Sequence, residues 1–367
     1  MNSEFSKLQK IQSQLNASLS RLQSSLTEPN TDANTLSLIA QAKLNRYSDY
    51  SILFYRDFGG FSGGHLKVWD YFNHTLASPN YLPYIYFYSD HTCWNNSNPW
   101  VTTDSHLILS QPLSTPDVIF IDGLDWLQFD RQFLQNNTIP IINLIQGMRH
   151  CQPDNPRYQF LKYKAIRICV SPEVQDSLQK IDQVNGPIFC IPNGIDTSLL
   201  PQPLNFTEKQ DKILISAQKQ PQLGVQLKQL LELQGNSVNL LLTPQSRAEY
   251  FNQINQAKIA IFLPNRQEHE GFYLPALEAM ALGTFVICPD CIGNRSFCLP
   301  SYNCFRPNYT LEEIVNAVNI ALSLSSLQFN QIIKNAKKIV EKHSLNQERQ
   351  AFLEILGQIQ DLWSQQE

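Results

Sequence analysis

Short apolar runs of strand type alternate with helical patterns twice along this chain, and this alternation narrows the choice of fold more than any other property of the sequence. The first set of runs comprises residues 51–55, 84–88, 117–121, 141–145, 166–170 and 188–191. The second set comprises residues 212–217, 238–243, 259–264 and 284–289. Strands that alternate with helices form parallel sheets with both faces covered. The sequence therefore predicts an α/β fold with two doubly wound, Rossmann-like domains.

A turn cluster at residues 192–196 and a polar stretch at residues 201–211 separate the two sets. The 367 residues suffice for two domains of about 150–180 residues and an extension. Two such domains facing each other leave a central cleft at the carboxyl ends of their strands. The expected parts are a helical extension at 1–46, a first domain at 47–200, a second domain at 205–345 and a final helix at 346–367 that packs across the domain junction.

The first 46 residues carry one apolar stripe with spacings of three and four, formed by Phe5, Leu8, Ile11, Leu15, Leu19, Leu22 and Leu26. Such spacing indicates an amphipathic helix, and a second, shorter helical pattern follows Pro29. A helical hairpin packed on its own domain explains the stripe. A homodimer arm through residues 1–46, or a surface for another partner, explains it as well, and we favour the hairpin because the stripe identifies no partner.

Charge and hydropathy exclude several classes of protein. The formal net charge is −4 and no long basic run occurs, so no nucleic-acid partner is expected. No apolar stretch approaches the ~18–20 residues of a transmembrane segment. The N-terminus lacks the layout of a signal peptide, so the expected location is cytoplasmic. The eight cysteines and scattered histidines match no common metal spacing, and we expect no bound metal.

A glycine-rich segment at residues 57–68 follows the first expected strand and opens the first expected helix. Glycines let the backbone turn tightly and approach a ligand, and a helix N-terminus offers unpaired N–H groups to an anion. Gly63 and Gly64 are therefore candidates for lining a ligand site.

Glu270 and Glu278 flank the expected start of a helix that follows the third strand of the second set. Proline is tolerated in a first turn, so the helix should begin near Pro275, with Glu270 on the preceding loop and Glu278 inside the first turns. A carboxylate on a helix flank suits paired hydroxyls such as a ribose diol. The loop N–H groups of Gly271 and Phe272 suit a phosphate.

The run from Glu270 to Gly283, EGFYLPALEAMALG, resembles the Glu-x7-Glu signature of retaining glycosyltransferases with the GT-B fold. These are the sucrose-synthase-like and mannosyltransferase-like enzymes of glycosyltransferase family four. Weaker similarity to that family lies at residues 192–196 (PNGID), at residues 116–118 (PDV) and at the pair Gly63 and Gly64. The resemblance implies two Rossmann-like domains facing a cleft, with the domain at 47–200 binding the acceptor and the domain at 205–345 binding the nucleotide-sugar donor. It also implies a hexosyltransferase with no cofactor and no metal. The acceptor, whether a glycan, a lipid or a small molecule, stays unidentified.

The resemblance also implies roles for particular residues. Glu278 would bind the donor ribose, and Glu270 would lie beside the transferred sugar. The remaining donor-binding residues would be Gly271, Phe272, Tyr273, Gly63 and Gly64.

Two departures from the family pattern affect the expected site. The family's phosphate-binding Arg and Lys-Gly after the first strand of the second domain are missing, and only Lys219 can take that part, with Arg295 as a source of a second positive charge. The family often ends the strand at 141–145 with a His that touches the donor sugar. This chain has Gln146 there and His150 four residues later, and either can contact the sugar.

These departures keep open a second function, a non-catalytic subunit of the same fold that binds a glycan or a nucleotide sugar. A nucleotide-sugar epimerase and a glycosyl phosphorylase are disfavoured by the Glu-x7-Glu layout. The sequence therefore predicts a glycosyltransferase and leaves the donor base, the sugar and the oligomeric state open.

Overall fold

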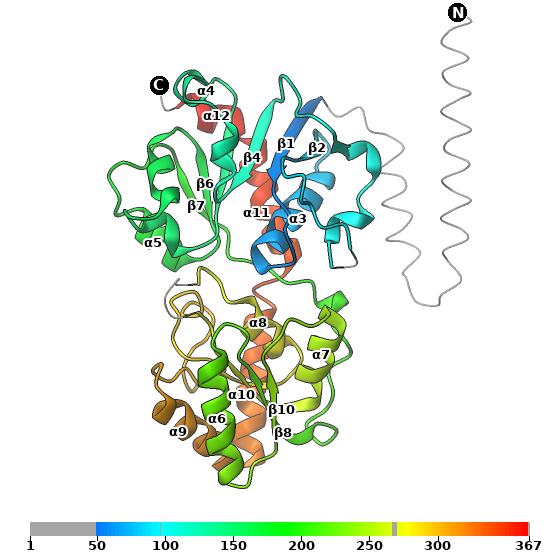
Figure 1. Cartoon of the computed structure of the whole chain (residues 1–367), viewed down its shortest axis with the longest axis vertical. Coiled ribbons are helices and arrows are strands. Elements are labelled where there is room, and N and C mark those ends of the chain that lie inside the picture. Colours follow the sequence, from blue (N-terminus) through cyan, green and yellow to red (C-terminus); the bar gives the residue numbers. More distant parts are fainter. Residues whose placement is uncertain (1–48, 96, 266–269, 366–367) are drawn as a thin grey trace, which may run out of the picture. The chain divides into compact units, whose positions relative to one another are not determined.

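The structure is a computed structural model that describes residues 49–95, 97–265 and 270–365 (Figure 1). The helical stripe of residues 1–46 and its proposed use in dimerisation lie outside the described residues. Residues 49–367 form one compact unit, distinct from residues 1–48. Everything below concerns that unit.

The first sheet within the described residues has seven strands, all parallel. Their order across the sheet is β3 (Ile108–Leu109), β2 (Tyr81–Phe87), β1 (Tyr50–Arg56), β4 (Val118–Asp122), β5 (Ile141–Ile145), β6 (Ile166–Cys169) and β7 (Ile188–Cys190). Side chains alternate between the two faces, as the two-residue period of a strand requires. In β1, Ile52 and Phe54 belong to one buried cluster, and Leu53 and Tyr55 belong to another on the opposite face.

Helices and short 3-10 turns cover both faces of the first sheet. Helix α3 (Gly63–Leu76) and helix α5 (Pro172–Leu178) contribute buried residues to the cluster that contains Ile52 and Phe54. On the other face, Trp126 and Phe160 from 3-10 turns pack with Leu53, and helix α4 (Arg131–Asn136) lies over them through its half-buried Phe133 and Leu134. Because both faces are buried, the strands read as continuous apolar runs in the sequence.

The second sheet has four parallel strands within the described residues, in the order β11 (Phe285–Ile287), β10 (Ala257–Phe262), β8 (Gln210–Ser216) and β9 (Val238–Leu241). One face packs on helices α6 (Pro221–Leu233) and α9 (Leu311–Ser323), and the other on helices α7 (Arg247–Gln256) and α8 (Leu274–Ala281). Helix α10 (Ser326–Val340) contributes to both clusters (Figure 1). This is again a doubly wound arrangement.

The last two helices return to the first sheet. Helix α11 (Leu345–Gly357) packs beside α3, with Phe352 edge-on to Tyr71 at 4.8 Å (Figure 1). Trp363 of helix α12 (Ile359–Ser364) joins the cluster on the other face of that sheet. Among the helices of the described part of the chain, none has the length and apolar character needed to cross a membrane.

The two doubly wound sheets confirm the expected fold class, and every run expected to be a strand contains one. Strand β3 was not expected. It has only two residues, both half-buried at the sheet edge, so it leaves no apolar run to detect. The strands of the first sheet lie within residues 47–200 and those of the second within residues 205–345.

Candidate functional site

Each sheet has a point at its carboxyl edge where the strand order reverses, and open α/β sheets bind ligands at such points, which are called crevices below. β1 lies between β2 and β4, so the connections on its two sides run in opposite directions outside the carboxyl ends of β1 and β4. β8 lies between β9 and β10 and creates the same reversal in the second sheet. Polar residues lie at both places: Arg56 and Asp122 end β1 and β4 in the first sheet, and Lys219 and Glu270 follow β8 and β10 in the second.

A buried ionic network fills the crevice of the first sheet. Arg56 Nη1 donates to Asp122 Oδ2 at 3.0 Å and lies 3.5 Å from Asp125 Oδ2. Asp125 accepts hydrogen bonds from the Tyr88 hydroxyl and from the Asp122 N–H, each at 2.8 Å, and so closes the turn after β4. Burial raises the pKa of Asp125 to about 7 even though the Arg56 guanidinium opposes the shift.

Gln146 connects this network to the glycine-rich loop. Its Nε2 donates to the Gly64 carbonyl at 2.9 Å and to Asp122 Oδ2 at 3.0 Å. Gly63, the first residue of α3, lies against Leu274 of the second sheet's α8, since a Cβ there would be 3.5 Å from Leu274 Cδ1. The loop with the two glycines therefore contacts residues from both sheets.

Two histidines near this network are held neutral. His65 Nδ1 accepts from Arg56 Nε at 3.0 Å, and burial, together with the Arg56 charge, lowers the pKa of His65 to about 4. His150 is 4% exposed, and its Nδ1 donates to the Gly147 carbonyl at 3.1 Å. Burial lowers the pKa of His150 to about 4, and its Nε2 has no partner among the described residues. Of the two residues predicted to contact a sugar, Gln146 is the one that lies against the glycine loop.

In the second sheet, Glu270 is bound from two sides. Lys219, three residues beyond the end of β8, places its Nζ 2.5 Å from Glu270 Oε1, and the Asn265 N–H donates to the same oxygen at 3.2 Å. Lys219 Nζ also lies 5.7 Å from the centre of the Tyr273 ring. The Lys219 side chain is 49% exposed, so its charge remains accessible to an anionic ligand.

The loop that carries Glu270 is fixed by close backbone contacts. Gly147 and Glu270 form an isolated antiparallel bridge between the two sheets' loops. A Cβ on Gly271 would lie 2.3 Å from the Gln146 carbonyl oxygen, and a Cβ on Gly293 would lie 2.4 Å from the Glu270 carbonyl oxygen. Real Cβ atoms do not approach backbone so closely, so glycine is required at both positions. The loop is thereby set opposite Gln146.

Glu278 lies inside helix α8, which begins at Leu274 with Pro275 in its first turn, as expected. Its side chain is 5% exposed, and Oε1 accepts from Arg247 Nη2 at 2.9 Å. Arg247 is the first residue of α7, and its guanidinium lies 5.2 Å from the centre of the Phe61 ring on the glycine-rich loop. Both Glu278 and Arg247 line a small pocket of about 30 Å³. That volume holds a water molecule or two and is far below the ~300 Å³ of an ordinary ligand pocket.

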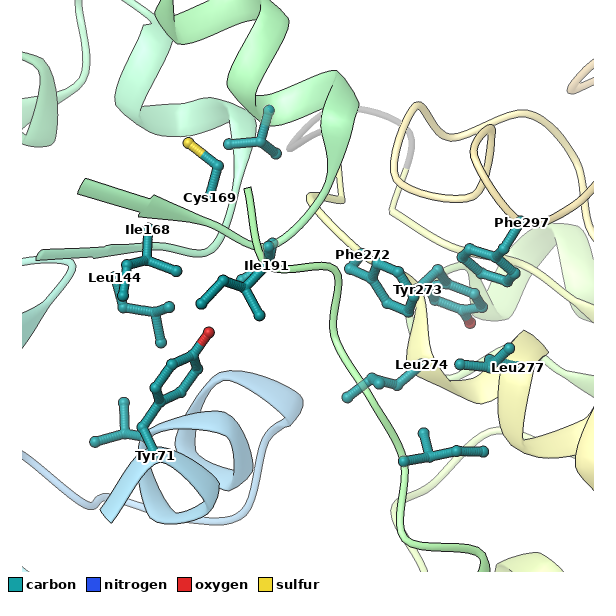
Figure 2. Packing of buried hydrophobic residues seen from close by; sticks show 14 of the residues in the cluster. Tyr71, Leu144, Ile168, Cys169, Ile191, Phe272, Tyr273, Leu274, Leu277 and Phe297 are labelled. Carbon is teal, nitrogen blue, oxygen red and sulfur yellow. The ribbon is translucent and has the colours of Figure 1, made fainter. Parts of the chain in front are cut away.

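The remaining predicted residues have structural partners. Phe272 is 8% exposed and stacks on Phe297 at 4.8 Å, in the cluster around the start of α8 that Figure 2 shows together with Tyr273 and Leu277. Arg295 donates from Nε and Nη2 to the two oxygens of Asp290, at 2.8 and 2.5 Å. Its guanidinium forms no hydrogen bond or ion pair with Glu270 or Glu278, and its role toward a ligand stays a prediction.

The structure thus brings together Glu270, Lys219, Gln146, Gly64 and the loop from Gly271 to Tyr273. Sequence reasoning missed Arg247, the partner of Glu278. A signal was present: Ser246 and Glu249 form a capping box, which marks a helix start directly after β9 and places Arg247 at the same carboxyl edge.

Comparisons with known proteins bear on the fold and on the family of this chain. Residues 221–339, which contain β9 to β11, α6 to α9 and all but the last residue of α10, match the family model described as "Glycosyl transferases group 1". No curated protein matches the sequence.

Solved structures match most of the chain. Sucrose-phosphate synthase from Thermosynechococcus elongatus is 14% identical over 84% of this chain and 98% of its own, with a TM-score of 0.62. HepE from Anabaena in complex with UDP-glucose is 15% identical over 84% and 99%, with a TM-score of 0.63. A glycosyltransferase from Rickettsia africae is 16% identical over 85% and 99%, with a TM-score of 0.60. This chain therefore has the GT-B fold, and the part of it that forms most of the second sheet and its helices is similar to the group 1 glycosyl transferases.

Proposed function

We propose that this chain is a glycosyltransferase that moves a hexose from a nucleotide-sugar donor to an acceptor with retention of the anomeric configuration. The observation that carries the proposal is the placement of Glu270 and Glu278 on the loop and first turns of α8, with Glu270 bridged to Gly147 and bound by Lys219. The group 1 match covers this whole segment. We assign Glu270 to the sugar end of the donor and Glu278 to its ribose end. Lys219 lies at the carboxyl ends of strands β8 and β10 and supplies a positive charge.

The donor contacts follow from this geometry. Glu278 binds the two ribose hydroxyls, because a carboxylate accepts from both of them at once. In the structure Arg247 forms an ion pair with Glu278, and the Arg247 side chain is 36% exposed. The Arg247 end of the pair reaches solvent while Glu278 is buried, so Arg247 can turn outward when the ribose hydroxyls replace it as donors to the Glu278 carboxylate.

The chemistry depends on the diphosphate as a leaving group. The bond between the anomeric carbon and the phosphate oxygen breaks, and the acceptor oxygen forms a new bond from the same face while its proton passes to the departing phosphate. Negative charge therefore grows on the diphosphate. Lys219 Nζ and the backbone of the loop after Glu270 stabilise that charge, which is the largest contribution a protein makes in such reactions.

Gln146 is the proposed partner of the transferred sugar on the first sheet. It lies directly opposite the Glu270 loop, since the Gly271 position would touch its carbonyl oxygen. His150 acts through the Gly147 carbonyl and orients the loop that carries Gln146. Asp122, which binds both Gln146 and Arg56, fixes the amide in this direction.

The first test is donor binding by the wild type and by Glu278→Gln. We expect Glu278→Gln to weaken donor affinity about 10- to 100-fold, because hydrogen bonds to a charged group contribute about 1.5–3 kcal/mol. UDP-glucose is the first donor to try, since HepE was solved with it. Calorimetric titration gives the affinity, and release of glucose or transfer to a sugar acceptor gives the activity.

A matched control is Glu232→Gln on α6, a carboxylate that pairs with Lys228 at 3.6 Å and is exposed. It should leave donor binding unchanged. If a donor binds but its sugar is never transferred or hydrolysed, the proposed transferase function fails. The chain is then a non-catalytic binding subunit of the same fold. Equal affinities in wild type and Glu278→Gln for every nucleotide sugar would contradict the donor site itself.

A further inference from the structure

A second cavity lies away from the site above. It has a volume of about 480 Å³, within the ~300–1,000 Å³ range of small-molecule pockets. It is lined by Ile141, the first residue of β5, by Lys164 just before β6 and by Asn185 just before β7. These positions mark the amino edge of the first sheet. Glu270, Gln146 and Asp122 follow strands at carboxyl edges, so the cavity is separate from the donor site.

The walls of the cavity carry three positive side chains. Arg131 begins helix α4, and Lys162 and Lys164 flank Tyr163 before β6. Within the described residues none of the three has a carboxylate within ion-pair distance, and the cavity lining contains no Asp or Glu. In contrast, Arg56 is paired with Asp122, and Lys219 is paired with Glu270.

A fourth positive charge lies behind the wall. Arg167 in β6 is 0% exposed and donates to the carbonyls of Phe160, Leu161, Tyr163, Ala165 and Asn185. Within the described residues it forms no ion pair with a carboxylate, and burial lowers its pKa to about 9. Carbonyl dipoles solvate the guanidinium but leave its net charge uncompensated. We therefore expect a positive electrostatic potential inside the adjacent cavity, with contributions from Arg167 and from the three cations of the wall.

Aromatic rings complete the lining. Trp126 and Trp363 are buried, Tyr163 is half-buried, and Trp126 is stacked on Phe160 at 5.9 Å. Lys164 Nζ lies 4.6 Å from the centre of the Trp363 ring, which holds that lysine at the wall. Fixed aromatic walls offer apolar area to the ring of a ligand, and the unpaired cations offer charge-assisted hydrogen bonds to a phosphate.

We propose that this cavity binds a phosphorylated monosaccharide, with the phosphate held by Arg131 and Lys162 and the sugar ring against the aromatic wall. A phosphate suits a site with an excess of cations, and arginine binds its oxygens in pairs. The volume of about 480 Å³ suits one sugar with its phosphate. The site is independent of the proposed transfer reaction, because none of its residues belongs to the donor crevice.

The test is calorimetric titration of the full-length protein with glucose 6-phosphate, with glucose and with inorganic phosphate, in the absence of any nucleotide. The wild type should bind glucose 6-phosphate with a Kd of about 1 mM or below, at least about tenfold tighter than either fragment probe. The double variant Arg131→Gln/Lys162→Gln should weaken this binding at least about tenfold. Both side chains are exposed and form no ion pair with a carboxylate of the described residues, so the variant should fold.

Two further variants make the result specific. Lys334→Gln/Lys338→Gln on the exposed face of α10 removes the same net charge and should bind like the wild type. Lys219→Gln, at the donor crevice, should also bind like the wild type. Loss of glucose 6-phosphate binding in Lys219→Gln but not in Arg131→Gln/Lys162→Gln would assign the phosphate to the donor crevice and overturn the proposal. Absence of binding by the wild type at about 10 mM would overturn it as well.

Discussion

Lys67→Met is expected to lower the free energy of unfolding by about 3–5 kcal/mol, because it leaves two buried carboxylates without their cation. Lys67 is 1% exposed, and its Nζ lies 2.7 Å from both Asp70 Oδ2 and Glu348 Oε2. It also donates to the Gly194 carbonyl at 3.1 Å. Methionine keeps most of the side-chain volume, so the loss reports on charge more than on packing.

The size of this effect follows from where the network lies. Glu348 also binds His74 Nε2 at 3.0 Å and the Gly194 N–H, so it is fully engaged at 2% exposure. Lys67 and His74 belong to α3, Gly194 to the segment after β7, and Glu348 to α11, which follows the second sheet. One buried ion cluster therefore joins the first sheet to the two segments where the chain leaves and re-enters it.

Urea denaturation of the purified protein measures the change. Lys228→Met on α6 is the control, since its pair with Glu232 is exposed and should contribute less than about 0.5 kcal/mol. The double variant Lys67→Met/Glu348→Gln should lose less than the sum of its two single variants, because it leaves fewer uncompensated charges. A loss below about 1 kcal/mol in Lys67→Met, or strict additivity, would show that the cluster does not act as a buried network.

Much of the fold could be predicted from the sequence because its signals are local. Residues 141–145 and 284–289 are apolar runs bounded by turn residues, and they become β5 and β11. The start of α8 at Leu274 follows from Pro275, which is tolerated in a first turn, and from Gly271 on the loop before the helix. The spacing of Glu270 and Glu278 is also local, so both carboxylates could be placed before any tertiary structure was known.

The partners of those carboxylates could not be predicted, because they come from other loops. Lys219 is 51 positions from Glu270, and Arg247 is 31 positions from Glu278. The order of strands β11, β10, β8 and β9 decides which loops meet, and a single sequence does not state that order. The burial of His150 has a similar origin, since it depends on how the 3-10 turn after β5 packs on its neighbours.

The same limit applies to the choice between Lys219 and Arg295 as the main positive charge at the diphosphate. Both were predicted from their loops. The structure gives them different surroundings: Lys219 contacts Glu270 at the crevice between β8 and β10, and Arg295 is bound through two of its nitrogens to Asp290. A guanidinium already satisfied by a carboxylate has less to offer a second anion, so Lys219 should dominate.

Lys219→Gln is therefore expected to lower kcat for sugar transfer about 100- to 1,000-fold, the loss that follows removal of one fixed group from a developing anion. The affinity for the donor should fall much less, because the charge on the leaving diphosphate is greatest in the transition state. Arg295→Gln should stay within about tenfold of the wild type in kcat. Steady-state kinetics with the donor found by titration measure both variants.

Lys219→Arg separates charge from geometry in this comparison. Arginine keeps the positive charge but presents a planar fork in place of a single ammonium, so it should recover part of the rate lost in Lys219→Gln. Recovery would assign the loss to missing charge at the diphosphate. If Arg295→Gln is the slower enzyme and Lys219→Gln is nearly normal, Lys219 serves only to hold Glu270 in place, and the leaving group is stabilised from the loop after β11. The two outcomes assign the departing phosphate to different loops, the one after β8 or the one after β11, so this pair of variants orients the donor as well as identifying its cation.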